Sequence, residues 1–530
     1  MKPSAWTAPA ALVALGAALP FLPSLSGGFL QWDDALAFLS HERWRGLSWT
    51  HLRWMSTTFH MGPWQPLSWL TYGVDHALWG LRPLGYRLTN LLLHAGACAL
   101  AFLLFDELAR AGAPREDRRA RAAAAAVGAL FFAVHPLRVE SVCWISERRD
   151  VLCGFFYLLS LCLYARRARR GGSPFQCWLA FAAACLSKGS ALTLPLTLLI
   201  LDAYPLKRRA LLEKIPFFAV SLVVGLIGLL GERSVGFLKT LDEVGPGQRL
   251  ALSVYSLWFY AQKTLVPASL APYYPVPEGF GPRSVALPAA AVTAVCAAAW
   301  ALRRRAPALP AALAHHAVAL LPMLGVVRIG KQLVSDHHSY LPGVGWGALA
   351  AAAYLAAPRR RARPVLAAAA LLFLAAVSAR LSAIWRDDLS LWERGVAEQP
   401  RSLAALANMA HALRAAGRVD EAAEFERRAL EVDPDNAALG NNLASWLLAK
   451  ERTTEALDLL DRAARLDPTN PHIRRNRSNA LASLINEGNA RARLGRLAEA
   501  AELYRRALRT DPENGAARRN LEQVRRALGR

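Results

Sequence analysis

The sequence lacks the short motifs that would assign it to a metal or redox enzyme. Its seven cysteines include no Cys-x-x-Cys pair and fall mostly within apolar runs, so we expect them to be small buried hydrophobic side chains. The histidine pairs His315-His316 and His337-His338 are adjacent, which suits chelation less well than an i, i+4 spacing on a helix. The sequence therefore predicts no metal and no bound cofactor. No convincing small-x-small cleavage site precedes Gly27, so the first apolar run is expected to stay in the chain.

The composition excludes an ordinary soluble enzyme. Of the 530 residues, 54% are hydrophobic and the mean hydropathy is +0.20, yet Lys plus Arg number 63 against 40 Asp plus Glu. The net charge of +23 would suit nucleic acid, but the arginine clusters punctuate apolar segments instead of lining one face or tail. A membrane topology explains this pattern better, and we expect an all-α, polytopic helical membrane protein that binds no nucleic acid.

Basic clusters alternate with pairs of apolar runs along the chain. If all five clusters (110–121, 166–170, 207–214, 303–305 and 359–363) lie on the cytoplasmic side, the spans between them must come in pairs. The sequence then predicts eleven spans, with the N-terminus inside and the C-terminus outside. Segment 250–267 would break this parity, so we expect it to be an external or re-entrant helix. The predicted spans are at about 8–25, 84–104, 122–136, 150–165, 174–187, 189–204, 215–231, 284–302, 308–327, 341–357 and 364–380.

Two adjacent carboxylates follow the first predicted span. The segment Gly27–Asp34 ends in Asp33 and Asp34, which would emerge at the membrane surface. Ionisable groups at that position are costly to desolvate and often mark a working site, although a solvated interfacial pair is the alternative. We expect one of the two aspartates to be a catalytic base.

Other unusual polar residues collect on the same predicted side. In the second span, Arg87, Asn90 and His94 share one helix face that should point into the protein. The outward connections contribute further cations, imidazoles and carboxylates. We expect both groups to bind the phosphate and sugar of a donor, the alternative for each single residue being an ordinary loop charge. The connections also carry Lys331 and His338, and the residues in them that we expect to bind the donor are His135, Glu140, Arg148, Arg149, Asp150, Lys188, Asp336, His337 and Tyr340.

The last part of the chain changes to an Ala-rich helical pattern with an internal period. Pro400, Pro434 and Pro468 recur at 34 residues, and small residues repeat at fixed places within each unit. This is the tetratricopeptide pattern, and it predicts three repeats and a terminal helix at 515–528. Such an α-solenoid usually holds an extended peptide or a partner helix on its concave side. The expected organisation is a membrane domain at 1–385, a linker at 386–400 and a repeat domain at 401–530.

A polyprenyl-phosphate sugar would suit this arrangement as a substrate. Its tail would lie among the spans, its phosphate would meet Arg148, Arg149 or Lys188, and its sugar would sit outside. Because phosphate is a competent leaving group, one carboxylate that deprotonates an acceptor hydroxyl would suffice for a single displacement with inversion.

Three stretches of the sequence resemble a known family. They are Asp33-Asp34, the run from Pro66 to His94, and His135-Pro136 through to Asp150. With the order of spans and then repeats, they are similar to the transmembrane and tetratricopeptide repeat-containing proteins, O-mannosyltransferases of the GT-C superfamily with bacterial relatives. The resemblance implies a GT-C-like membrane domain, a polyprenyl-phosphate sugar donor and a catalytic aspartate in the first external loop.

The sequence therefore predicts a membrane glycosyltransferase that modifies a protein hydroxyl or another extracytoplasmic acceptor recruited by the repeats. The rich Ala and Arg content is typical of a bacterial chain, so the active side would be the periplasm and the membrane the inner one. The alternative is a non-enzymatic, membrane-anchored scaffold for cell-envelope assembly. A transporter is disfavoured, because no matching halves with Gly- or Pro-broken helices are evident.

Overall fold

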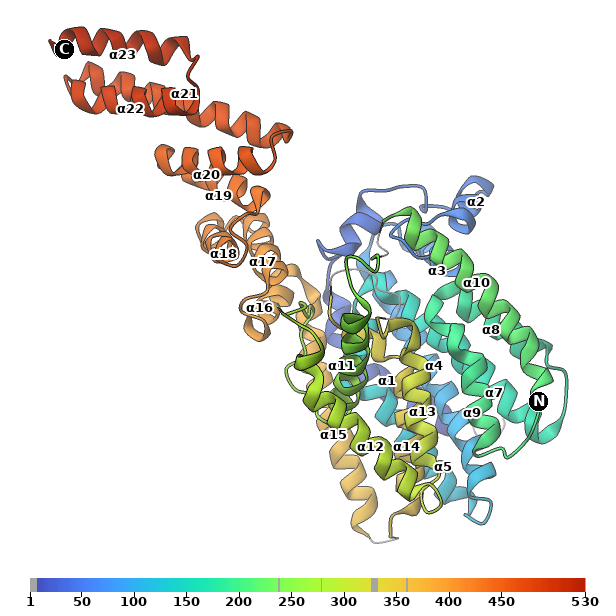
Figure 1. Ribbon diagram of the computed structural model, residues 1–530. Helices are drawn as coiled ribbons and strands as arrows, with labels where there is room; N and C mark the ends of the chain where they lie inside the picture. Colours follow the sequence, from blue (N-terminus) through green and yellow to red (C-terminus); the bar gives the residue numbers. More distant parts are fainter. Residues whose placement is uncertain (1–6, 237–238, 278, 326–331, 359–360, 530) are drawn as a thin grey trace. The chain divides into compact units, whose positions relative to one another are not determined.

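The computed structural model is helical in both of its compact units, Met1–Arg394 and Gly395–Arg530. It describes residues 7–236, 239–277, 279–325, 332–358 and 361–529 (Figure 1). Lys331 and the basic residues Arg359 and Arg360 lie outside this described part of the chain. The all-α class expected from the sequence is confirmed.

Each of the eleven predicted spans corresponds to a helix of the first unit (Figure 1). The first span consists of α1 and a following 3-10 segment, Leu19–Ser26. The helices are α1 (Thr7–Ala18), α4 (Pro83–Gly112), α5 (Arg118–Val134), α7 (Arg148–Arg170), α8 (Phe175–Ser187), α9 (Leu194–Ala203), α10 (Ile215–Ser234), α12 (Ala286–Leu302), α13 (Ala308–Leu320), α14 (Pro342–Ala356) and α15 (Ala362–Ser382).

Fewer than eleven of these helices are long and apolar enough to count as membrane spans. Among the described residues, six segments are long and apolar enough to cross a bilayer, and the number rises to seven if α5 and Pro136–Cys143, bent by 57°, form one broken span. The helix α11 (Pro246–Leu265), expected to lie outside the set of spans, is not one of the six. The six are Ala8–Ser26, Pro83–Gly112, Ile145–Arg170, Leu212–Ser234, Pro282–Leu302 and Ala362–Arg386.

Helix α4 lies at the centre of the first unit, where it packs against α1, α5 and α7. Nearby, α5 and α14 approach each other through glycines. A Cβ atom built on Gly128 would stand 2.4 Å from the Gly347 carbonyl oxygen and 2.8 Å from the Ala351 Cβ. Small residues allow membrane helices to pack backbone against backbone, so this crossing depends on the missing side chain.

The aromatic segment after the first span has both buried and exposed members. Trp44 and Trp69 pack in a core with Tyr72 and Tyr86. Trp49, at the start of α2 (Trp49–Thr57), is 77% exposed. Only part of this segment therefore has the exposed aromatic character that an interfacial position requires. The next helix, α3 (Pro66–Trp79), leads into α4.

The second unit is a stack of helix pairs. Three pairs and a terminal helix follow one another, as the 34-residue period predicts. The third pair departs from this period because α21 has 23 residues, whereas α17 and α19 have 13 each. The helices are α17 (Leu403–Ala415), α18 (Val419–Val432), α19 (Ala437–Ala449), α20 (Thr453–Leu466), α21 (Pro471–Arg493), α22 (Leu497–Thr510) and α23 (Gly515–Ala527).

Alanines at the repeat positions let these helices pack closely. Ala444, Ala456 and Ala500 are fully buried in one core that runs through the repeats. The segment expected to be a linker, 386–400, contains the helix α16 (Asp388–Glu398), and the division between the two units falls within this helix.

Replacing Gly128 by alanine should destabilise the first unit, because the new methyl group overlaps a backbone oxygen of α14. We expect the free energy of unfolding to fall by about 1–3 kcal/mol, seen as a lower thermal midpoint of the purified protein. Gly228→Ala in α10 is the matched control, since a Cβ there meets nothing within 4 Å. Equal midpoints for the two variants would contradict the close crossing.

Candidate active site

Asp34 is an anchor that joins the first loop to the segment before α7. Its side chain is fully buried. One oxygen, Oδ2, accepts the Leu30 N–H at 3.0 Å. The other, Oδ1, accepts both the backbone N–H (3.1 Å) and the hydroxyl (2.5 Å) of Ser146. Burial raises the pKa of Asp34, and these hydrogen bonds oppose that shift. Both carboxylate oxygens are thus engaged in holding the backbone.

Asp33 differs from its neighbour in having no hydrogen bond among the described residues. It is half-buried, and the preceding Trp32 stacks on Trp144 with ring centroids 4.5 Å apart. Burial raises the pKa of Asp33 to about 6. The carboxylates of Glu147 and Asp34 add to the increase, and the Arg149 guanidinium opposes it. Asp33 is therefore a weakly solvated carboxylate, free to accept a proton near neutral pH.

A buried group of opposite charges lies close to Asp33. Glu147 precedes α7 in the 3-10 turn Ile145–Glu147, and Asp150 lies in the first turn of α7. The Lys188 ammonium enters from the connection after α8 and donates to Glu147 Oε2 (3.0 Å) and to Asp150 Oδ1 (2.8 Å). The Arg149 guanidinium also pairs with Glu147. Glu147 is fully buried, so these cations offset most of the cost of desolvating it.

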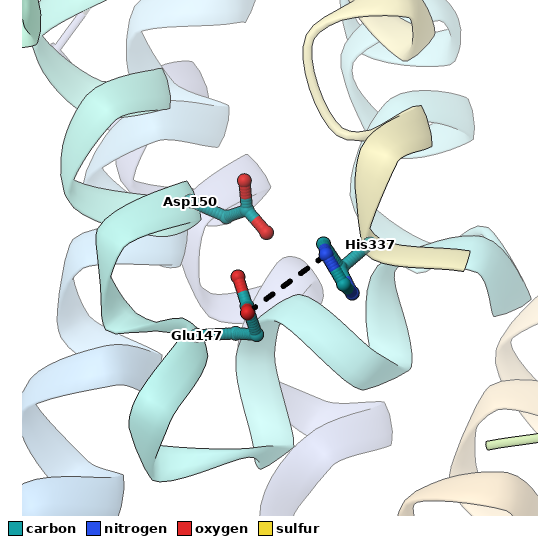
Figure 2. A group of neighbouring side chains, drawn as sticks. All are labelled: Glu147, Asp150 and His337. Carbon is teal, nitrogen blue, oxygen red and sulfur yellow. Dashed lines mark ion pairs between the residues drawn. The ribbon is translucent and has the colours of Figure 1, made fainter. Parts of the chain in front are cut away.

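His337 approaches the same group from the short helix Asp336–Ser339 (Figure 2). Its Nδ1 lies 2.9 Å from Glu140 Oε1, and its backbone N–H donates to Glu140 Oε2 at 2.9 Å. On the other side of the ring, Nε2 faces Glu147 Oε1 at 3.8 Å. The adjacent Asp336 accepts the Tyr274 hydroxyl at 3.0 Å, and burial raises the pKa of Asp336.

Several predicted site residues instead fasten the loops to the helices. Arg87 donates to the carbonyls of Cys143 (2.7 Å), Gly28 (2.6 Å) and Trp385 (2.8 Å). Arg148, also predicted to meet the donor phosphate, pairs with Asp75 at 2.5 Å. Both guanidinium groups are buried and already bonded to the protein, so they support the loops around the site.

Asn90 and three other predicted residues are likewise bonded within the framework. The Arg148 Nε donates to Asn90 Oδ1 at 2.8 Å. His94 Nδ1 lies 2.8 Å from the Tyr340 hydroxyl, while its Nε2 faces the Ala133 carbonyl at 3.1 Å. His135 Nε2 faces the Thr264 carbonyl at 3.0 Å. The fold therefore brings together Asp33, Glu140, Arg149, Asp150, Lys188 and His337.

The sequence analysis missed Glu147 and Ser146. Glu147 lies three residues before Asp150, a spacing that places two side chains on the same side of a helical turn. That spacing was a usable signal for Glu147. Ser146 carried none, because its role depends on Asp34, which is 112 residues away.

Because ionised Asp33 is costly to bury, Asp33→Asn should stabilise the fold at pH 7.5. A folded-state pKa of about 6 against 3.8 means that folding favours the protonated form, so stability is lost as pH rises through this range. The neutral amide should recover up to about 3 kcal/mol of the free energy of unfolding that is lost when the carboxylate ionises. We expect a higher thermal midpoint than wild type at pH 7.5 and a much smaller difference at pH 4. The exposed Asp242→Asn is the control, and an identical shift at both pH values would refute the assignment.

Comparisons with known proteins agree with the order of spans and then repeats. Tetratricopeptide repeat models match residues 413–480 and 482–514. The human protein O-mannosyl-transferase TMTC2 is 30% identical over 186 residues, which cover 34% of this chain and 21% of that protein. The human TMTC4 is 33% identical over 28% of this chain and 22% of its own length. The Drosophila melanogaster Tmtc1 is 37% identical over 25% of this chain and 14% of its own length.

The chain aligns with only about a fifth of the length of these curated relatives. A solved structure, that of ArnT from Cupriavidus metallidurans bound to undecaprenyl phosphate, is 14% identical with a TM-score of 0.36, over 87% of this chain and 80% of that one. The resemblance expected from the sequence is confirmed: the chain is similar to the protein O-mannosyl-transferases with transmembrane and tetratricopeptide regions.

Proposed function

We propose that the chain is a GT-C-type membrane glycosyltransferase, which moves a sugar from a polyprenyl-phosphate donor to a hydroxyl group on an extracytoplasmic acceptor. The observation that carries this proposal is Asp33, a half-buried carboxylate that makes no hydrogen bond among the described residues and lies near the Arg149 cation. The similarity to protein O-mannosyl-transferases supports a serine or threonine hydroxyl of a protein as the acceptor.

The reaction is a single displacement. Asp33 takes the proton of the acceptor hydroxyl while the hydroxyl oxygen forms a bond to the anomeric carbon of the sugar. The bond between that carbon and the phosphate oxygen breaks, and its electron pair leaves with the phosphate. The product has the inverted configuration. Arg149 and Lys188 stabilise the charge that grows on the phosphate, since cations in a dry site interact strongly with developing charge.

Within this proposal the two aspartates have different roles. Asp34 uses both oxygens to hold Leu30 and Ser146, so a proton acceptor is better provided by Asp33. Asp34 positions the turn that carries Glu147. Through Glu147, it sets the place of Arg149 and Lys188.

The proposed topology has eleven spans, with the N-terminus in the cytoplasm and the active site and repeats in the periplasm. It rests on the eleven helices at the predicted positions and on the basic clusters that separate their pairs. The repeat domain then recruits the acceptor protein through its concave side. The lipid-linked sugar is a substrate, and the membrane supplies the medium for its tail.

The test is transfer of a labelled sugar from a polyprenyl-phosphate donor by membranes that contain equal amounts of each variant. Asp33→Asn should lower the rate by a factor of about 10²–10⁴, as expected for loss of a general base. Asp242→Asn should transfer at the wild-type rate, because Asp242 is exposed in the connection between α10 and α11. Wild-type activity in a folded Asp33→Asn variant would overturn the assignment of the base.

The pH dependence of transfer should report the same carboxylate. A base works only when it is ionised, and the pKa of Asp33 is about 6. The rate should therefore fall about tenfold per pH unit well below pH 6 and level off above pH 7. An acidic limb with a midpoint near 4 would indicate a well-solvated carboxylate instead of Asp33.

A further inference from the structure

We propose that Glu147, Asp150 and His337 form a binding site for one divalent transition-metal ion of the Mn²⁺ or Zn²⁺ type. Each residue offers one ligand atom, and these atoms all lie within 4.8 Å of one another. Figure 2 shows the two carboxylates at the start of α7 facing the imidazole of His337, which comes from a separate segment of the chain. All three side chains are buried.

The imidazole of His337 is oriented as a metal ligand requires. Its Nδ1 lies 2.9 Å from the Glu140 carboxylate, which fixes the proton on that nitrogen and leaves the lone pair on Nε2. A carboxylate behind a ligating histidine is the usual means of setting both tautomer and ring direction. The Nε2 lone pair points toward Glu147 Oε1 at 3.8 Å, beyond hydrogen-bond distance. Two acceptors face each other there, and a cation between them would satisfy both.

The charges around the site leave room for a further cation. Three carboxylates belong to this group. Arg149 and Lys188 pair with those of Glu147 and Asp150, and the third, Glu140, faces His337. Like charges held this close in a buried place favour uptake of a cation or a proton. Lys188 donates to one oxygen of each of Glu147 and Asp150, and the Arg149 guanidinium donates to both oxygens of Glu147. Because an ionised carboxylate has about four lone-pair positions, Asp150 can bind lysine and a metal together, whereas at Glu147 the metal takes the place of an Arg149 contact.

The ligand types indicate the class of metal. One imidazole with two carboxylates suits Zn²⁺ and Mn²⁺, whereas Mg²⁺ and Ca²⁺ prefer sites made only of oxygen. Three protein ligands also leave a coordination position open. If the proposed transfer reaction is right, the donor phosphate could fill that position. The metal site itself does not depend on that reaction.

The experiment measures metal binding directly. Full-length protein in nanodiscs is stripped with a chelator, the chelator is removed, and Mn²⁺ is titrated while the free-ion electron paramagnetic resonance signal is followed. We expect one saturable Mn²⁺ per chain, displaced by Zn²⁺, and a higher thermal midpoint with metal bound. His337→Ala and Glu147→Gln should weaken binding at least tenfold. Glu140→Gln should weaken it about 10–100-fold, as for other residues that orient a ligating histidine.

The matched control is His338→Ala, which removes the neighbouring imidazole. Its Nδ1 lies 3.2 Å from the Tyr260 hydroxyl, outside the proposed ligand set. Binding that is absent in wild type, or equal in His337→Ala and His338→Ala, would overturn the proposal and leave the group as a closed network of ion pairs. The metal-free midpoints of all variants show whether each one folds. If Asp33→Asn transfers the sugar at the wild-type rate and the protein still binds the metal, the proposed base is wrong and the metal site stands.

Discussion

The carboxylate of Asp34 is the contact on which the arrangement of the site depends. It ties the end of the first loop, through Leu30, to Ser146 at the entrance to α7. A fully buried charge is costly unless hydrogen bonds satisfy it, and here three donors do so. The cost makes the geometry specific, because any other position of the turn would leave the carboxylate unpaired.

Around this anchor, the site combines compensated and uncompensated charge. Lys188 pairs with both Glu147 and Asp150, Arg149 pairs with Glu147, and Arg148 pairs with Asp75. Among the described residues Asp33 makes no hydrogen bond, and the Arg149 guanidinium opposes its raised pKa only in part. A carboxylate left in that state reduces stability and gains proton affinity, which is the compromise that a general base near neutral pH requires.

Different forces stabilise the two units. In the membrane unit, the surroundings of the helices are as apolar as their own side chains, so close packing at small residues such as Gly128 and Gly347 provides the specificity. In the repeat unit, water provides the driving force. Alanines at the helix crossings and larger residues such as Leu457 and Leu484 bury one continuous core.

Much of the fold followed from local patterns in the sequence. Apolar runs located each helix, although α4 continues to Gly112, beyond its apolar run, and the 34-residue period determined the helix pairs of the repeat unit. Apolarity alone did not settle how many helices cross the membrane. A short apolar run such as Phe175–Ser187 has the same composition whether it spans a bilayer or is buried in protein.

The sequence by itself also pointed to loops that the fold brings together, since carboxylates and cations beside apolar spans are costly to bury and therefore informative. It could not separate Asp33 from Asp34, or a phosphate-facing arginine from Arg87 and Arg148, which bond to the framework. Only the tertiary structure decided these roles. Hydrogen-bond partners such as Ser146 for Asp34 and Glu140 for His337 lie more than a hundred residues away, and no local pattern encodes which oxygen they will occupy.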